Sequence, residues 1–425
     1  MLSLLVALAQ SEPGFTSLFD GRTLAGWTER GGRYDGDADW RVEEGCIVGR
    51  QGPGGEGGLL YTEKSYTSFE LRLEVWLDHP FDSGVFLRML PPATGLKGAQ
   101  VTLDWREGGE IGAIYADGFL LHNQEGAQRF RRDAWNDLRV RCTGFDMQIE
   151  VELNGQPLTR FEQPSDAPGF APAGRIGLQV HGERGDTGAA RFRSVRIREL
   201  PVFADDFRGE PDTPPDARLA SAAAERGWRA LFDGRSLAGW SVDGPAERFR
   251  ARDGVLDFLA QGGGGHLATV EDFQDFALRL DFRTARMANS GLFLRAARDG
   301  SNAAFSGCEL QILDDFSWES VTGTKLKPWQ FTGSLYGAVA NPQRDALRPL
   351  GAWNTYEVLY RGSRLAVALN GRTLYDVDTH ALVPEQGEPF AKRATTGFIG
   401  LQHHGAELPS EEAMVSFRNV FVRRL

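Results

Sequence analysis

The chain has 425 residues, of which 41% are hydrophobic and 25% are charged, and its net charge is −11 at pH 7. An acidic chain of this kind lacks the basic stripe that nucleic-acid binding requires, so we expect no nucleic-acid partner. Three cysteines are too few, and odd in number, for a disulfide framework. Beyond the N-terminus, no stretch approaches the ~18 apolar residues of a membrane span, so we expect none.

The N-terminus opens with the apolar run MLSLLVALA, which ends in Ala7-Leu8-Ala9. Small residues at this spacing are typical of a signal-peptide cleavage site, although no Lys or Arg precedes the run. We therefore predict a signal peptide over residues 1–12 and a periplasmic or secreted location. The alternative is an apolar remnant of a misplaced start codon.

Both halves of the chain show the alternation of β-strands. Residues 69–75 place Phe69, Leu71, Leu73 and Val75 on one face, and residues 276–282 repeat the pattern. Period-2 alternation predicts an antiparallel strand with one wet face. Asn-Gly pairs at 154–155 and 370–371 predict type I′ hairpin turns. With 52 glycines and few apolar stretches of helical period, each half is predicted to be a β-sandwich.

A decapeptide occurs almost twice. Residues 18–27 read LFDGRTLAGW and residues 231–240 read LFDGRSLAGW, with the single change Thr23 to Ser236. A spacing of 213 residues exceeds the ~20–50 residues of a solenoid repeat, so the repeated unit is a whole domain. We predict a first domain over 13–202, a linker over 203–226 that includes a short helix in its Ala-rich part, and a second domain over 227–425. The Asp-Gly and Trp residues of the decapeptide are interpreted as turn and packing residues.

Further motifs identify a family resemblance. The segment SGVFLR at 83–88 returns as SGLFLR at 290–295, and GLQVHG at 177–182 returns as GLQHHG at 400–405. The second copy adds ELQILDD at 309–315 and TGSLYG at 332–337. As a set, these motifs resemble a bacterial family of secreted jelly-roll proteins associated with hydrolysis of 3-keto-disaccharides and 3-keto-glycosides.

The resemblance covers nearly all of the chain after residue 13. It implies an all-β fold of two tandem concanavalin A-like jelly-roll β-sandwich domains, a bacterial periplasmic or secreted protein, and a keto-sugar substrate. Whether a separate sugar 3-dehydrogenase acts as a partner that supplies the ketone is left open by the sequence.

The first copy departs from the motifs. When the glycines are matched, Gln100 stands in place of Glu309 and Thr102 in place of Gln311, and Asp82 replaces Asn289. We therefore expect the second copy to carry the activity, and the first to be a degenerate binding or packing module.

The chemistry implied by the resemblance starts at the ketone. A ketone at C3 acidifies the hydrogen on C2, so a base can remove it, the enolate can expel the C1 substituent, and water can then add. This route needs a base, an enolate stabiliser and an acid. We predict Glu309 as the base and Gln311 as the residue that orients the substrate, because alternate strand residues share a face. The alternative is that Glu309 forms a structural ion pair with Arg295.

Other residues join this site as candidates. His404 and Asp314 are further catalytic candidates; His404 shares a strand face with Gln402, and the first copy keeps that pair, which leaves a structural role open. The candidate substrate-binding residues, besides Gln311, are Asn289, Arg295, Lys325, Trp329, Tyr336, Gln402 and His403. Aromatic rings of the segment after Asp315 could stack on a pyranose, and the alternative is that they anchor the loop.

No residue spacing typical of a metal site occurs, and none is assigned. Glu309, Asp314, Asp315 and His404 have the right ligand types, so a divalent metal such as calcium stays open. For function, the enzyme on 3-keto-glycosides is the leading hypothesis. The alternative is a non-catalytic, lectin-like carbohydrate-binding protein, because one fold serves both.

Overall fold

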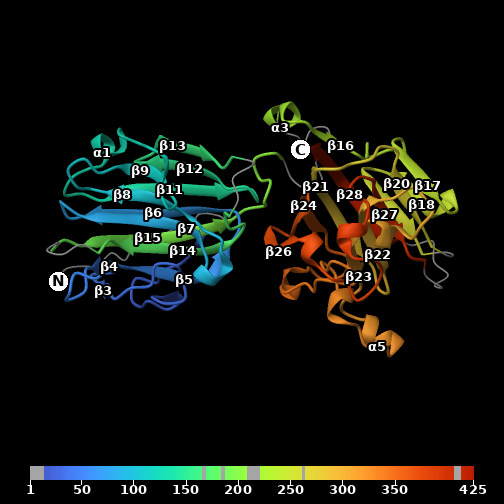
Figure 1. Ribbon diagram of the computed structural model, residues 1–425, viewed down its shortest axis with the longest axis horizontal. Helices are drawn as coiled ribbons and strands as arrows, with labels where there is room; N and C mark the ends of the chain where they lie inside the picture. Colours follow the sequence, from blue (N-terminus) through green and yellow to red (C-terminus); the bar gives the residue numbers. More distant parts are fainter. Residues whose placement is uncertain (1–13, 165–168, 183–186, 208–220, 261–263, 406–412) are drawn as a thin grey trace, which may run out of the picture. The chain divides into compact units, whose positions relative to one another are not determined.

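The computed structural model describes residues 14–164, 169–182, 187–207, 221–260, 264–405 and 413–425. The predicted signal peptide and residues 208–220 of the predicted linker lie outside the described residues. The chain divides into two compact units, Met1–Val202 and Phe203–Leu425, which we call the first and second domain (Figure 1).

The first domain consists of two antiparallel sheets. The larger sheet has the strand order β13 (Gln156–Glu162), β12 (Gln148–Leu153), β11 (Asn136–Thr143), β6 (Phe69–Leu77), β15 (Ala190–Glu199), β4 (Cys46–Arg50) and β3 (Asp39–Glu43), with β1 (Thr16–Ser17) on β15. The smaller sheet has the order β10 (Phe119–Leu121), β9 (Ile111–Tyr115), β8 (Ala99–Asp104), β7 (Asp82–Met89), β14 (Gly174–Val180), β5 (Gly58–Tyr66) and β2 (Trp27–Thr28). One helical turn, α1 (Gly126–Arg129), and the 3-10 turn η1 (Pro92–Thr94) lie in loops.

The second domain repeats this plan. Its larger sheet has the order β18 (Phe249–Arg252), β19 (Val255–Leu259), β28 (Ala413–Arg424), β21 (Phe276–Thr284), β24 (Asn354–Arg361), β25 (Arg364–Leu369) and β26 (Arg372–Asp378), with β16 (Trp228–Ala230) on β28. Its smaller sheet has the order β17 (Trp240–Asp243), β20 (Gly265–Thr269), β27 (Phe398–His403), β22 (Asn289–Ala296) and β23 (Cys308–Leu313).

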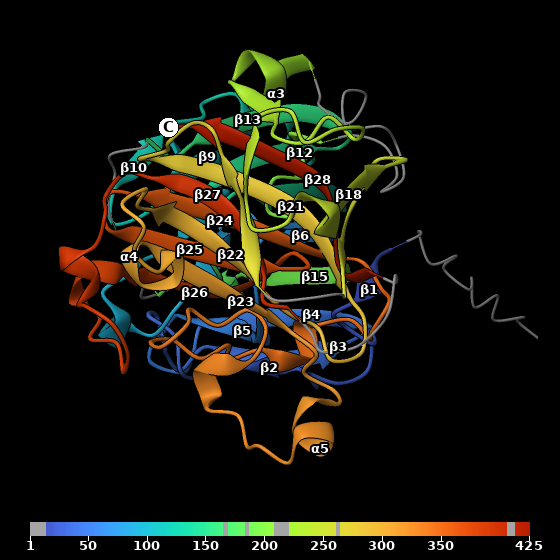
Figure 2. The same ribbon diagram turned by 90° about the vertical axis from the view of Figure 1, so that its right-hand side faces the viewer.

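The helices of the second domain are short. They are α3 (Ser221–Glu225), α4 (Ala303–Ser306) and α5 (Trp318–Thr322), and the 3-10 turns are η2 (Ala246–Arg248), η3 (Pro328–Gln330), η4 (Arg344–Ala346), η5 (Thr379–Ala381) and η6 (Phe390–Lys392). Figures 1 and 2 place α5 beyond the β23 edge of the smaller sheet. Among the described helices, none is long and apolar enough to cross a membrane.

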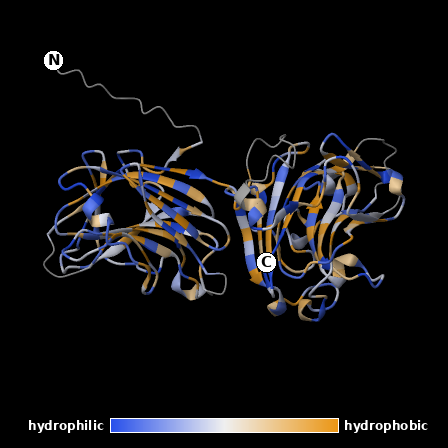
Figure 3. Cartoon of the chain, turned by 90° about the horizontal axis from the view of Figure 1, so that it is seen from above, coloured by the Kyte–Doolittle hydropathy of each residue, from blue (hydrophilic) through white to orange (hydrophobic). Residues whose placement is uncertain are grey.

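Each domain encloses its own core between its two sheets. Leu71, Leu73 and Val75 of β6 are fully buried in the first core, and Leu278, Leu280 and Phe282 of β21 in the second. The strands therefore alternate between apolar and polar residues along their length (Figure 3). The predicted fold, two tandem concanavalin A-like jelly-roll β-sandwiches, is confirmed.

The repeated decapeptide forms the same turn in both domains. The Asp233 carboxylate accepts hydrogen bonds from the backbone N–H of Arg235 and Ser236, both at 2.8 Å, and Asp20 does the same in the first copy at 2.7 Å. The indole of Trp240 donates to the carbonyl of Leu231 at 2.7 Å, closing the loop onto its own start. The interpretation of the repeat as turn and packing residues is confirmed.

The Asn-Gly turns also form as predicted. Asn370 and Gly371 join β25 to β26 with φ of 53° and 81°. Positive φ at both positions is what a type I′ turn requires.

Candidate active site

The outer face of the five-stranded sheet carries a row of polar side chains. Leu292 pairs with Leu401, and both lie in the core between the sheets. The residues one position along therefore face away from the core, because strand side chains alternate. By the same register this outward row runs across the five strands through Asp243, His266, Gln402, Gly291 and Gln311.

Glu309 projects from β23 on this outer face. It lies opposite Phe293 in the strand register, and its side chain is only 4% exposed. Burial raises the pKa of its carboxyl to about 8, because a desolvated carboxylate resists ionisation. Among the described residues, no side chain or backbone group forms a hydrogen bond or ion pair with this carboxyl. Glu309 is thus a buried, unpaired acid whose protonation changes close to neutral pH.

Gly291 makes room for that carboxyl. A Cβ atom at Gly291 would lie 2.1 Å from Oε1 of Glu309, far inside van der Waals contact. Gly84 has the same relation to Gln100 in the first domain, at 2.2 Å from Nε2. The glycine of the SG-x-F-x-R motif therefore provides the space in which the residue on the neighbouring strand lies.

Arg295 does not pair with Glu309, so the structure contradicts the alternative of a structural ion pair. Its buried guanidinium donates to Asp275 at 2.9 Å and to the carbonyl of Gly362 at 2.7 Å, and it stacks on Tyr360 at 3.5 Å. The guanidinium of Arg295 is therefore bound to other groups inside the domain. These contacts favour a structural role for Arg295, and its contact with substrate stays a prediction.

Gln311 and Tyr336 flank Glu309. Oε1 of Gln311 accepts a hydrogen bond from the backbone N–H of Ile312 at 3.1 Å, which leaves its amide NH₂ group as a donor. The backbone N–H of Tyr336 donates to the carbonyl of Glu309 at 2.9 Å, next to a bridge between Leu310 and Leu335. Because the bridged leucines face the core, Glu309 and Tyr336 both face outward.

Trp329 packs against the ring of Tyr336. Its ring is buried and meets the Tyr336 ring edge-to-face at 4.7 Å. Trp329 therefore holds Tyr336 in place in this structure, in agreement with the loop-anchoring alternative. Asn289 is half-buried at the start of β22, opposite Leu313.

The two adjacent histidines face opposite ways. His403 is fully buried between the sheets, where its Nε2 contacts the carbonyl of Leu259 and its ring stacks on Phe258. The structure contradicts His403 as a substrate-binding residue, because strand alternation turns it into the core. His404 is exposed just beyond β27, and Gln402 keeps a buried Oε1 with no hydrogen-bond partner among the described residues.

Asp314 acts as a cap at the end of β23. Its buried carboxylate accepts hydrogen bonds from the backbone N–H groups of Met287 at 2.8 Å and of Phe316 and Ser317 at 3.0 Å, and it also contacts the Ser317 hydroxyl. Four partners leave this carboxylate no free oxygen lone pair directed at a ligand, so the geometry indicates a structural role. The hydrogen bonds favour a capping role, and a catalytic role of Asp314 stays a prediction.

Lys325 lies on the surface of the loop that carries α5. Its side chain is 87% exposed and pairs with Glu319 at 2.8 Å. A solvated surface ion pair of this kind contributes little to recognition or stability. Lys325 is therefore a solvent-exposed side chain that pairs with Glu319, and its contact with substrate stays a prediction.

His266 and Asp243 are site residues that the sequence reasoning missed. Nδ1 of His266 lies 3.1 Å from the Asp243 carboxylate, and the ring stacks on Phe398 at 5.4 Å. Burial lowers the pKa of this histidine. His266 follows a glycine-rich run that reads as a loop, and only its pairing opposite Gln402 places it on the outward row.

The donor set considered for a metal is not assembled in the described part of the chain. There, no three His, Cys, Asp or Glu side chains lie close enough to form a metal site. Asp314 in particular is committed to its backbone partners, as described above.

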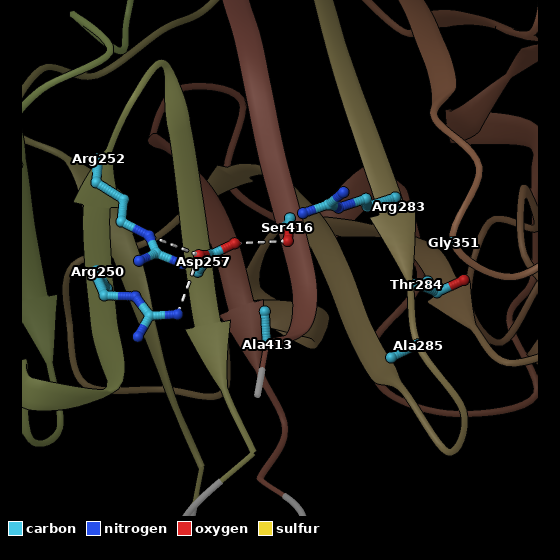
Figure 4. Close-up of a pocket in the computed structure, with 9 residues that line it drawn as sticks. All are labelled: Arg250, Arg252, Asp257, Arg283, Thr284, Ala285, Gly351, Ala413 and Ser416. Carbon is cyan, nitrogen blue, oxygen red and sulfur yellow. Dashed lines mark hydrogen bonds and ion pairs between the residues drawn. The ribbon is translucent and has the colours of Figure 1, made fainter. Parts of the chain in front are cut away.

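A cavity of this domain lies away from Glu309. It has a volume of about 540 Å³ and lies on the outer face of the larger sheet, where Arg250, Asp257 and Ser416 stand in register across β18, β19 and β28 (Figure 4). Asp257 accepts hydrogen bonds from Ser416 at 2.7 Å and from Arg250 at 3.3 Å. Because its carboxylate is already paired, this cavity offers no free base, and the reaction is not assigned to it.

Comparison with known proteins places the chain in a family. The family model of a 3-keto-alpha-glucoside-1,2-lyase-like domain matches residues 14–198 and again residues 227–423. A 3-keto-disaccharide hydrolase from Bacteroides thetaiotaomicron is 24% identical over 241 residues, which cover 47% of this chain and 79% of that protein.

Solved structures are similar to one domain's length of the chain. A Parabacteroides distasonis protein with the provisional name glycosyl hydrolase is 26% identical, with a TM-score of 0.40, over 49% of this chain and 98% of that one. A carbohydrate-binding module from Bacillus subtilis is 13% identical, with a TM-score of 0.28, over 44% of this chain and 95% of that one. Because the two regions matched by the family model span most of the sequence, the chain belongs to the 3-keto-alpha-glucoside-1,2-lyase-like domain family.

Proposed function

We propose that the second domain cleaves 3-keto-glycosides or 3-keto-disaccharides, with Glu309 as the base that removes the proton from C2. The observation that carries this proposal is the buried carboxyl of Glu309 on the outward face, which has no partner among the described residues and whose pKa is raised to about 8. A general base works best when its pKa lies near the operating pH, because it is then both available and basic.

Neighbouring groups supply the other requirements of the reaction. When the C2–H bond breaks, its electron pair forms the enolate whose oxygen is the former ketone. The free NH₂ group of Gln311 is the donor that we assign to that oxygen. Collapse of the enolate breaks the bond from C1 to the leaving oxygen, which takes up a proton. Addition of water to the resulting alkene then completes a hydrolysis.

The proton for the leaving oxygen is assigned to an imidazole on the same face. His266 is supported by the Asp243 carboxylate at 3.1 Å, which orients the ring and favours its charged form, in opposition to burial. His404, which is exposed beyond β27, is the second candidate for this step. Phe293 lies between His266 and Glu309, with its ring 5.8 Å from His266, and belongs to a buried apolar cluster with Ala304 and Phe398 on this face.

The test is release of a chromogenic aglycone from a 3-keto-glucoside by the full chain. Glu309→Gln keeps the shape of the side chain and removes the base, so kcat is expected to fall about 10²–10⁴-fold. Glu271→Gln, a surface carboxylate of the same domain, is the matched control and is expected to keep wild-type turnover. If the wild type binds keto-sugars without releasing aglycone, the lectin-like alternative replaces the enzyme.

A further inference from the structure

The first domain contains a cavity of its own, of about 630 Å³, on the outer face of its smaller sheet. Its floor is formed by Phe86 of β7, Gln100 and Thr102 of β8, and Gln179 of β14. The volume falls within the range of about 300–1,000 Å³ that is typical of small-molecule sites. The cavity occupies the face that corresponds to the candidate active site of the second domain, although the groups that line it differ.

The floor cannot perform the reaction proposed for the second domain. Gln100 stands where Glu309 stands in the second domain, and its Nε2 donates to Oε1 of Gln179 at 2.7 Å. A glutamine amide does not accept a proton near neutral pH, so Gln100 cannot act as a base. The pair nevertheless leaves one amide oxygen and one NH₂ group facing the cavity, which are an acceptor and a donor for ligand hydroxyl groups.

Aromatic rings form the walls. Tyr34 packs against Phe86 at 5.5 Å and is 37% exposed, and Phe119 is 49% exposed beside Tyr115 at 5.4 Å. Large aromatic side chains facing solvent at a cavity are typical of a binding surface. The wall made by Tyr115 and Phe119 belongs to β9 and β10, and among the described residues the five-stranded sheet of the second domain has no counterpart of these two strands.

The rim is built from fixed carboxylates. Arg106 donates to Asp82 at 2.9 Å and to Asp104 at 2.8 Å, which holds both groups in place as acceptors. In all, the lining contains two arginines and four carboxylates, which leaves a net charge of −2. Anionic ligands are therefore repelled, while the hydroxyl groups of a neutral ligand find acceptors and the apolar faces of its rings find aromatic walls.

We propose that the first domain is a non-catalytic module that binds a neutral saccharide of one or two sugar units in this cavity. Tyr34 and Phe119 stack on the sugar, and Gln100, Gln179 and the carboxylates of the rim bind its hydroxyl groups. The proposal does not depend on the activity of the second domain.

The experiment measures binding to the full chain by calorimetry in the Glu309→Gln background, so that no turnover occurs. The probes are cellobiose, maltose and laminaribiose, with a galacturonate disaccharide as the anionic comparison. At least one neutral disaccharide is expected to bind, and Phe119→Ala and Tyr34→Ala are each expected to weaken that binding at least about twofold, the lower end of a lost ring contact. Both rings are partly exposed, so their truncation leaves the core intact.

Leu120→Ala is the matched control, because Leu120 is a similarly exposed residue of β10 that does not line the cavity. The Kd of the disaccharide for this variant is expected to equal that of the parent. The proposal is overturned if no neutral disaccharide binds, if both aromatic variants bind like the parent, or if the galacturonate binds more tightly. A wild type that fails to release aglycone contradicts the proposed function of the second domain, and these binding results are unaffected by it.

Discussion

Glu309 and Gln100 hold corresponding positions in the two domains, and their surroundings explain much of the difference between the domains. Gln100 has an amide partner in Gln179 at 2.7 Å, whereas Glu309 has no partner among the described residues. Burial of an unpaired carboxyl costs several kcal/mol unless the group stays protonated. A position that served only packing would be satisfied by the neutral amide, as in the first domain. The presence of an acid at this position in the second domain therefore favours a chemical role.

The pH dependence of turnover tests this role of Glu309. A base must be ionised to act, and the pKa of Glu309 is raised to about 8. With an aglycone that leaves without help from the imidazole acid, such as a nitrophenol, we expect kcat/KM to rise about tenfold per pH unit below pH 8 and to level off above it. A pH–rate profile from pH 5.5 to 9.5 measures this. A rate that falls above pH 8 would instead show that Glu309 acts as an acid, and a flat profile would remove it from the chemistry.

Gly291 offers a second test at the residue scale. An alanine there would place its Cβ atom 2.1 Å from Oε1 of Glu309, so the carboxyl must move. Displacement of a catalytic group by about 1 Å can cost about 10²-fold in rate, and we expect that loss in kcat for Gly291→Ala. Gly84→Ala introduces the same crowding beside Gln100 and is the matched control. Equal losses in both variants would indicate general damage to the fold.

At the scale of elements, the two domains differ after β23, the edge strand of the smaller sheet in the second domain. The first domain continues from β8 into β9 and β10, whereas the second continues from β23 into the segment that carries α5. Asp314 and Asp315 fix that segment at its two ends. Asp315 accepts hydrogen bonds from the backbone and hydroxyl of Thr332, at 3.0 and 2.8 Å, and burial raises its pKa to about 6.

Asp314→Asn separates a capping role from a catalytic one. The amide keeps one oxygen and loses the charge, so hydrogen bonds from backbone N–H groups are weakened, and we expect a loss of stability of about 1–3 kcal/mol. Thermal unfolding measures the stability, and aglycone release at a temperature where the variant is folded measures activity, which we expect to fall less than tenfold. An intact melting temperature with abolished turnover would restore Asp314 as a catalytic residue.

At the scale of the whole molecule, one scaffold carries two differently equipped faces. The turn of the decapeptide, the Asn-Gly hairpins and the glycine that accommodates residue 309 or 100 are common to both domains. These features form the β-sandwich, so they are the same in both domains although the outward-facing side chains differ. The side chains on that face are free to diverge, because the core does not depend on them.

The β-sandwich fold, the duplication and the turns could be predicted from the sequence, since they rest on period-2 alternation and local turn chemistry. Glu309, Gln311 and Tyr336 were also found in sequence, by their motifs, and the structure places all three on or beside the outward face of β23. Their roles in catalysis stay predictions.

The tertiary structure alone decided which neighbours each side chain meets. It turned His403 into the core, tied Arg295 to Asp275 and Gly362, and made Asp314 a cap. It also brought His266 and Asp243 into the row of Gln402 and Gln311. The physical reason is that strand alternation is a local property written in the chain, whereas the register between strands distant in sequence is set by the packing of the whole sheet.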